Sequence, residues 1–240
     1  MADTIQSHTV KSFDDDIHQL RSLITQMGGL CEAQIIDSID ALMRRDADAA
    51  SAVVAVDARI DALEAEAESL AISIIARRAP MANDLREIVA ALKISSVLER
   101  VGDYAKNIAK RTSVLAQAAP IQPMVIIPEM GRVVAGMIKD VLDAFVDRDA
   151  AKALEVCQRD AGVDDYYSSL FRSLLTFMME NPHHITPSAH LLFIAKNLER
   201  IGDHATNVGE MVYYSATGTR MADRTRGDDA SLASVAAIAA

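Results

Sequence analysis

The residues best placed to do chemistry in this chain are polar ones that occur twice, one hundred positions apart. Residues 98–107 read LERVGDYAKN, and residues 198–207 read LERIGDHATN. A duplicated packing unit would keep its apolar residues first, whereas here two acids and an amide survive at intervals of four. Because residues four apart share a face of a helix, each copy predicts one oxygen-rich stripe. The stripes are Glu99, Asp103 and Asn107 in the first copy and Glu199, Asp203 and Asn207 in the second.

A second acidic pair accompanies each stripe on the preceding predicted helix. Asp57 and Asp61 lie four residues apart, and Asp160 and Asp164 are their equivalents in the second half. Like charges at this spacing destabilise a helix by about 0.2–0.5 kcal/mol per pair, so their retention through a duplication indicates a bridging cation. Carboxylates from two adjacent helices suit divalent or trivalent ions such as Fe, Zn, Mn or Mg. The lack of His or Cys ligands leaves the metal unidentified.

The same acids have a simpler interpretation, in which they only keep a helix surface solvated. A single E-x-x-x-D pattern is common on exposed helices, and Arg100 and Arg200 beside the glutamates could form weak surface ion pairs. The apolar residues of the predicted helix lie opposite the acids, so we expect the carboxylates on the outside of a bundle. His204, which stands where the first copy has Tyr104, is expected to pack rather than to bind metal.

Composition narrows the class of protein. Half of the 240 residues are hydrophobic, glycine and proline are few, and tryptophan is absent, which favours helices. The formal net charge of −10 argues against nucleic acid and anionic membrane surfaces as partners. Cys31 and Cys157 are expected to be ordinary reduced thiols. The polar N-terminus and the lack of an apolar stretch of membrane-spanning length predict a cytoplasmic protein.

Apolar residues recur three and four positions apart, which predicts six helices in two sets of three. In the first set, Ser12 is expected to cap the first helix and Asp46 the second. Pro80 closes the second helix, and a third helix is predicted at 83–116. Proline residues after position 118 mark a connection between the halves.

The second set of helices repeats the first. Equivalent residues of the two sets lie 103 positions apart in the first two helices and 100 positions apart at the repeated motif. Thr186 and Pro187 are expected to cap and open its last helix. The sequence therefore predicts an all-α chain built as a tandem repeat of two three-helix bundles. The expected units are 11–118 and 124–217, followed by a disordered tail at 218–240.

At these residues the chain resembles the PhoU family of bacterial proteins. The resemblance covers nearly all of residues 11–218 and rests on the tandem organisation, on the Asp84-Leu85-Arg86 segment, and on the two L-E-R-[VI]-G-D-x-A-x-N copies. It implies two three-helix bundles whose paired E(D)xxxD motifs can carry metal ions. On this chain the motifs fall on Asp57, Asp61, Glu99 and Asp103 and on Asp160, Asp164, Glu199 and Asp203, with Asn107 and Asn207 extending each stripe.

The resemblance also implies a function. Members of the family act when phosphate is plentiful, holding the phosphate-sensing histidine kinase in its phosphatase state and restraining uptake through the phosphate ABC transporter. They contact the kinase and the transporter's ATPase subunit, tend to form homodimers, and are not enzymes. We therefore expect a negative regulator that reaches the membrane only through its partners and does not bind nucleic acid. The alternatives are a carboxylate-bridged metal-dependent enzyme and a metal-free helical adaptor.

Overall fold

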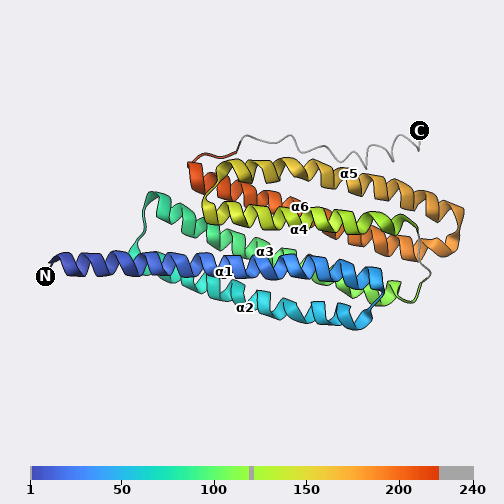
Figure 1. Cartoon of the computed structure of the whole chain (residues 1–240), viewed down its shortest axis with the longest axis horizontal. Helices are drawn as coiled ribbons and strands as arrows, with labels where there is room; N and C mark the ends of the chain where they lie inside the picture. Colours follow the sequence, from blue (N-terminus) through green and yellow to red (C-terminus); the bar gives the residue numbers. More distant parts are fainter. Residues whose placement is uncertain (1, 119–121, 222–240) are drawn as a thin grey trace.

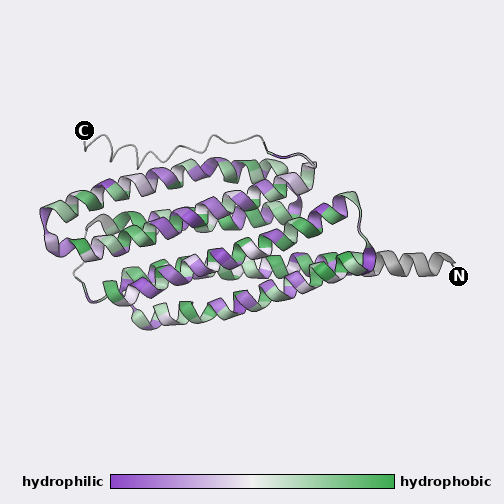
Figure 2. Ribbon diagram, turned by 180° about the vertical axis from the view of Figure 1, so that it is seen from behind, coloured by the Kyte–Doolittle hydropathy of each residue, from purple (hydrophilic) through white to green (hydrophobic). Residues whose placement is uncertain are grey.

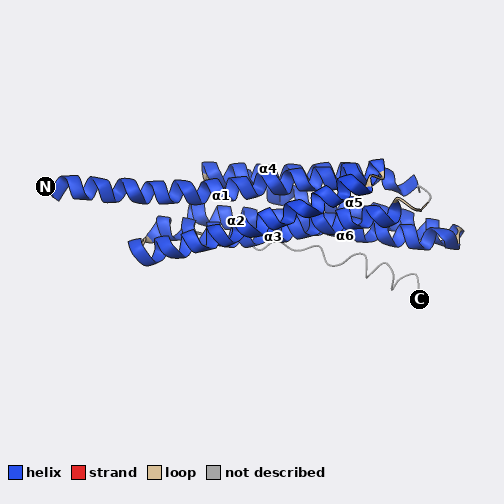
Figure 3. Cartoon of the chain, turned by 90° about the horizontal axis from the view of Figure 1, so that it is seen from below, coloured by secondary structure: helices blue, strands red, loops and turns tan. Residues whose placement is uncertain are grey.

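Six long α-helices make up most of the described chain. The computed structural model describes residues 2–118 and 122–221, with side chains described for 12–118 and 124–221. Within these residues there are no strands, which confirms the predicted fold class (Figure 3). Two short 3-10 turns, Gln122–Val125 and Pro182–His184, precede the fourth and sixth helices. The helices are α1 Ala2–Arg44, α2 Ala47–Arg78, α3 Ala82–Leu115, α4 Ile126–Asp147, α5 Ala150–Glu180 and α6 Ile185–Thr217.

The second helix of each set begins with an aspartate N-cap. The carboxylate of Asp46 accepts hydrogen bonds from the backbone N–H groups of the first turn of α2, and Asp149 does the same for α5. The residues before them, Arg45 and Arg148, adopt left-handed backbone conformations that turn the chain sharply. The predicted cap at Asp46 is thus confirmed, and its equivalent is present in the second half.

Two predicted helix starts are wrong. Ser12 lies inside α1, because that helix already begins at Ala2. Thr186 does not cap α6, whose preceding residue is His184 and makes no side-chain cap bond. Instead, the side chain of Asn181 accepts from the backbone N–H of His183 and opens the short turn before α6. Pro187 still falls in the first turn of α6, where no intrahelical partner for its nitrogen is needed.

The helices pack as two three-helix bundles side by side. Helices α1, α2 and α3 pack together, as do α4, α5 and α6, while α1 contacts α4 and α3 contacts α6 (Figure 1). Helices α3 and α6 run antiparallel, because Arg111 late in α3 lies over the ring of Phe193 early in α6. Buried apolar side chains from all six helices form one continuous core. Hydrophilic and hydrophobic positions alternate around the helices that surround this core (Figure 2).

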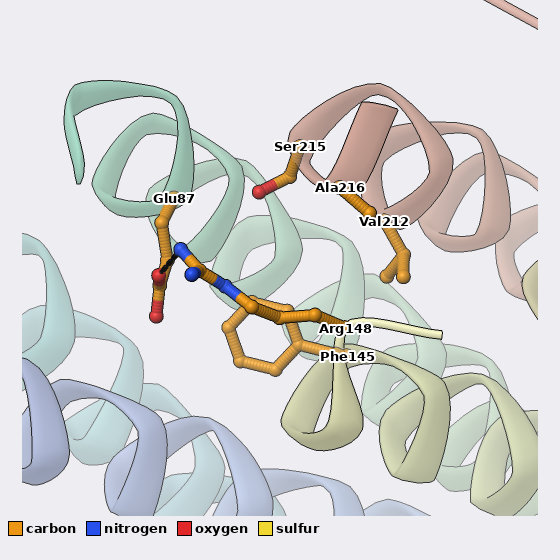
Figure 4. Close-up of a pocket in the computed structure, with 6 residues that line it drawn as sticks. All are labelled: Glu87, Phe145, Arg148, Val212, Ser215 and Ala216. Carbon is orange, nitrogen blue, oxygen red and sulfur yellow. Dashed lines mark hydrogen bonds and ion pairs between the residues drawn. The ribbon is translucent and has the colours of Figure 1, made fainter. Parts of the chain in front are cut away.

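One buried ion-pair network joins the bundles at an end of the molecule. Glu87 of α3 is only 5 % exposed and accepts a 2.5 Å hydrogen bond from Arg21 of α1. It also pairs with Arg148, which reaches across from the turn between α4 and α5 (Figure 4). The expected tail beyond Met221 lies outside the described residues. No helix of the described chain is long and apolar enough to cross a membrane.

Candidate metal centre on each repeat

The first acidic cluster lies along the seam between α2 and α3. Asp57 sits in the seam with 9 % of its surface exposed, and Asp61 lies one turn further along α2 on the outside. Glu99 of α3 lies close enough to the neighbouring acids for their charges to change its pKa. Partial burial, and then the negative charges of Asp103, Glu64 and Asp61, raise the pKa of Glu99 above its ordinary value. Carboxylates from two helices therefore converge in the first repeat.

A lysine occupies the Asp57 end of this cluster. Lys106 of α3 donates to Asp57 across the seam, with 2.5 Å between Nζ and Oδ2, and it also donates to Asp103 on its own helix. These two hydrogen bonds raise the pKa of Lys106, so its ammonium group stays charged. The first cluster thus contains a positive charge supplied by the chain itself.

The second cluster lies along the equivalent seam between α5 and α6. Asp160 is buried in it with 8 % of its surface exposed, and Asp164 lies one turn further along α5. Partial burial of the carboxyl group, and then the charges of Asp160, Glu199 and Asp203, raise the pKa of Asp164 to about 6. Burial is also the first cause that raises the pKa of Glu199. Carboxylates therefore converge in this repeat as well.

The lysine of the second cluster sits at the other end of the stripe. Lys196 donates to Glu199 Oε1 at 2.7 Å, and both residues belong to α6. Its ammonium group lies 5.2 Å from the centre of the Tyr167 ring. The second carboxylate oxygen of Glu199 is buried and has no hydrogen-bond partner. A buried anionic oxygen in that state is costly unless a donor or cation reaches it.

The acids lie at different depths in the structure. Asp203 is exposed on the outer surface, as predicted for the stripes, and Asp61 and Asp164 are exposed as well, whereas Asp57 and Asp160 of the preceding helices are buried. The spacing of residues along one helix predicts only which side of that helix each residue occupies. The burial of these two aspartates also depends on how closely the neighbouring helix packs.

That close approach depends on the glycines of the repeated motif. A Cβ atom at Gly102 would come within 2.9 Å of Ile60 Cδ1, and at Gly202 within 3.0 Å of Asp160 Oδ1. The glycines therefore let α3 and α6 lie tightly against α2 and α5.

The two asparagines of the stripes are not equivalent in the structure. Asn107 is exposed, whereas the amide nitrogen of Asn207 lies 3.5 Å from His204 Nδ1. Sequence reasoning also missed Glu64, Lys106 and Lys196 as parts of the clusters. Lys106 had a visible signal, because it lies three residues after Asp103 inside the repeated motif, at the position where the second copy has Thr206.

The oxygen donors of the two clusters are of the kind that hard cations prefer. Both clusters offer carboxylate oxygens from two helices, the Glu199 oxygen lacks a partner, and in the first cluster an ammonium group already bridges two of the acids. In the described chain, no group of three or more His, Cys, Asp or Glu side chains is arranged to hold a metal ion. Binding would therefore require some of these side chains to turn toward the ion.

An aromatic pair lies between the two repeats. Tyr104 of α3 and His204 of α6 occupy equivalent motif positions, and their rings stack with centroids 5.4 Å apart and planes 19° from parallel. Arg200 lies over the Tyr104 ring at 5.7 Å. Burial, and then the positive charge of Arg100, lower the pKa of His204. His204 therefore packs, as expected, and its imidazole is neutral at pH 7.

Two hollows of the described chain lie away from the acids. The crevice beside Glu87, Arg148 and Ser215 has no space for a water molecule (Figure 4). A hollow of about 180 Å³ lies nearby, between residues 13–21 of α1 and the start of α3, and is lined by Arg21 and Asp84 among others. Neither hollow includes a residue of the two acidic clusters.

Comparison with known proteins identifies the repeats. The family model described as the PhoU domain matches residues 24–112 and again 127–212. A phosphate-specific transport system accessory protein PhoU homolog from Zymomonas mobilis is 53 % identical over 222 residues, which cover 92 % of this chain and 94 % of that protein. A protein of the same name from Caulobacter vibrioides is 50 % identical over 215 residues, covering 89 % and 94 %.

Solved structures agree with this match. The crystal structure of PhoU from Pseudomonas aeruginosa has a TM-score of 0.83 and 38 % identity, and the match covers 86 % of this chain and all of that one. The phosphate transport system regulatory protein PhoU from Streptococcus pneumoniae has a TM-score of 0.81 and 27 % identity, covering 87 % and 99 %. The chain therefore belongs to the PhoU family, a family of transport accessory or regulatory proteins and not of enzymes.

Proposed function

We propose that this protein is a negative regulator of phosphate-starvation signalling and of high-affinity phosphate uptake. The observation that carries the proposal is the acidic cluster, which is built twice at equivalent positions on two PhoU-domain repeats. The names of the relatives, which are phosphate-specific transport system accessory proteins, supply the process.

In this proposal each cluster binds a divalent or trivalent metal ion. Carboxylates that raise one another's pKa repel, and a cation between them removes that repulsion. Asp57, Asp61, Glu99 and Asp103 would hold the ion in the first repeat, and Asp160, Asp164, Glu199 and Asp203 in the second. Bound metal would tie α2 to α3 and α5 to α6, and would reverse the local charge of an otherwise acidic face.

The protein would act by contact rather than by catalysis. Its partners in this proposal are the phosphate-sensing histidine kinase and the ATPase subunit of the phosphate ABC transporter. It would work as a cytoplasmic homodimer that meets the membrane through those partners. The long exposed helix faces support this view, because they offer continuous rigid surface while the acidic clusters lie outside the hollows described above.

The test measures alkaline phosphatase activity in cells grown with abundant phosphate. A strain that lacks this gene should show high activity, and the wild-type gene should silence it. A variant with Glu99, Asp103, Glu199 and Asp203 all changed to Ala should fail to silence it. A matched control removes four exposed carboxylates outside the clusters, Asp37, Glu66, Asp147 and Glu155, and should still silence.

Two results would count against the proposal in different ways. Silencing by the cluster variant would mean that the acids serve solubility and that the protein is a metal-free adaptor. Low activity in the deletion strain would show that the protein does not restrain the phosphate-starvation response.

A further inference from the structure

A row of cations runs along the seam where α3 and α6 meet. This basic row consists of Arg86, Lys93, Arg100 and Arg111 of α3 and Arg200 of α6. Its four members on α3 are spaced seven, seven and eleven residues apart, which places them on one side of that helix. Helices α1 and α4 pack on the inner side of α3 and α6 and contact each other. Because its members are exposed or half-buried, the basic row lies on the opposite side, toward solvent.

Contacts between the two helices confirm that the row is continuous. The guanidinium carbon of Arg111 lies 4.3 Å from the centre of the Phe193 ring, and that of Arg200 lies 5.7 Å from the centre of the Tyr104 ring. Seven residues, or about two turns, separate the two contacts on each helix, so both lie on the same side of the seam. From residue 86 to residue 111 the row is about 37 Å long, at about 1.5 Å per residue.

The positive charges of the row are not neutralised by carboxylates. Within the described residues, no ion pair involves Lys93, Arg100, Arg111 or Arg200. Aromatic rings hold two of the guanidinium groups instead, and a ring orders a guanidinium group without cancelling its charge. The row therefore presents ordered and uncompensated positive charge.

Two histidines beside the row respond to this charge. Burial, and then the positive charge of Arg111, lower the pKa of His190, whose Nδ1 lies 3.2 Å from that guanidinium group. Burial, and then the charge of Arg100, lower the pKa of His204. Both imidazoles are thus neutral at pH 7, and the arginines carry the charge of this surface.

Acidic residues border the row on both sides. Asp103 pairs with Lys106 on the side of α3 that faces α2. On the far side of α6, Asp203 lies close enough to Asp164 of α5 for its charge to act on that carboxyl group. The basic surface is therefore a narrow strip. A broad anionic surface, such as a nucleic acid or a membrane, would meet the bordering acids as well as the row.

We propose that the basic row is a docking surface for an acidic α-helix of a partner protein. This inference rests on the proposed function, in which the protein acts by contact, and deepens it by naming the surface and the chemistry of the partner.

Charge and shape both support an acidic helix as the occupant. The chain has a net charge of −10, so an acidic partner is repelled by most of the molecule and attracted to this strip. A straight row on a helix seam matches a helix that carries acids three and four residues apart on one face. Arginine and tyrosine, which stand together in the row, are also the residue types that contribute most to protein interfaces.

The first test repeats the alkaline phosphatase assay with a row variant, in which Lys93, Arg100 and Arg200 are changed to Gln. All three side chains are exposed and make no ion pair, so the variant should keep the helical circular dichroism and Tm of wild type. It should fail to silence the phosphatase in the deletion strain. The matched control loses the same charge at three exposed arginines away from the row, and should silence; these are Arg59, Arg172 and Arg220.

The second test measures binding directly. The purified full chain is titrated against the detergent-solubilised histidine kinase and, separately, against the purified ATPase subunit of the transporter. The row variant should bind at least one of them about tenfold more weakly, and the control variant should differ from wild type by less than about twofold. Wild-type binding should also weaken as salt is raised, because salt screens exposed charges.

The failures can be told apart. Silencing and binding by the row variant that equal those of wild type would overturn the inference and leave the proposed function standing. A changed oligomeric state of the row variant in analytical ultracentrifugation would assign the row to a second copy of this chain. Wild-type binding to phosphatidylserine vesicles that the row variant loses would assign it to anionic lipid, and either result would also overturn the inference. Low phosphatase activity in the deletion strain would remove the proposed function, and the partners with it.

Discussion

The two repeats share a fold and a motif but differ in how they balance charge. In the first repeat, Lys106 ties Asp57 to Asp103 across the α2–α3 seam. In the second, Lys196 pairs with Glu199 along one helix, and Asp164 has a pKa raised to about 6. The comparison teaches that duplication preserved the acids while each copy acquired its cation at a different place.

The same divergence is visible where the repeats meet. Arg45 and Arg148 are equivalent residues with the same left-handed backbone. Arg45 donates to backbone carbonyl groups at the end of α3 in its own repeat, including that of Leu115. Arg148 instead crosses to Glu87 of the other repeat. The position equivalent to Glu87 is Pro187, so this link is made once and not twice.

The largest effect is expected from breaking that single link. Glu87→Gln keeps the side-chain volume but leaves Arg21 and Arg148 without their carboxylate. Because Glu87 is buried, we expect a loss of about 2–3 kcal/mol in the free energy of unfolding, measured by urea denaturation. Arg132→Ala, which breaks an exposed pair with Glu129, is the control and should cost less than about 0.5 kcal/mol. Equal losses in both variants would show that the buried link stabilises the fold no more than an exposed ion pair does.

A second contrast concerns Ala109 and its equivalent, Gly209. A Cβ atom at Gly209 would lie 2.7 Å from Cys157 Sγ and 3.1 Å from the carbonyl oxygen of Ala153. Gly209→Ala should therefore destabilise the protein by about 1–2 kcal/mol, despite the better helix propensity of alanine.

The reciprocal change, Ala109→Gly, should cost about 1 kcal/mol, because it loses helix propensity and buried contacts. Thermal unfolding of both variants would check the pair. A stabilising Gly209→Ala would mean that the two seams are equally spacious.

The smallest expected effect is a change in how the stability of the fold depends on pH. Asp164 binds its proton more tightly in the folded chain than in the unfolded chain, so its ionised form destabilises the fold above about pH 6 and this penalty disappears below about pH 4. With chelator present, Asp164→Asn should raise Tm by a few degrees at pH 7 and leave it unchanged at pH 4. The equivalent Asp61→Asn should raise Tm less, because Lys106 already supplies positive charge. A rise at pH 4 as large as at pH 7 would exclude the electrostatic cause.

Much of the fold followed from local patterns. The periodicity of three and four predicted all six helices, the Asp46 cap and the end of α2 before Pro80, because these depend on residues within a turn or two. The start of α1 was missed, since Ser12 is a good cap by composition but the chain is already helical before it.

The candidate site was predicted less completely, because its distances cross between helices. The four acid pairs were visible as spacings of four, but the burial of Asp57 and Asp160 depends on how closely the neighbouring helix approaches. Lys106 was recognisable three residues after Asp103, yet its bridge to Asp57 requires the relative register of α2 and α3. The link between Glu87 and Arg148 spans 61 residues and left no local signal.

The stacked rings of Tyr104 and His204 make the two halves of the molecule distinguishable. A body made of two identical halves would offer any partner two interchangeable poses, related by half a turn. Here a phenol faces an imidazole at equivalent positions of the two halves, so the surface around the stack differs after that half turn. The ring pair therefore distinguishes the first repeat from the second at the place where the two repeats meet.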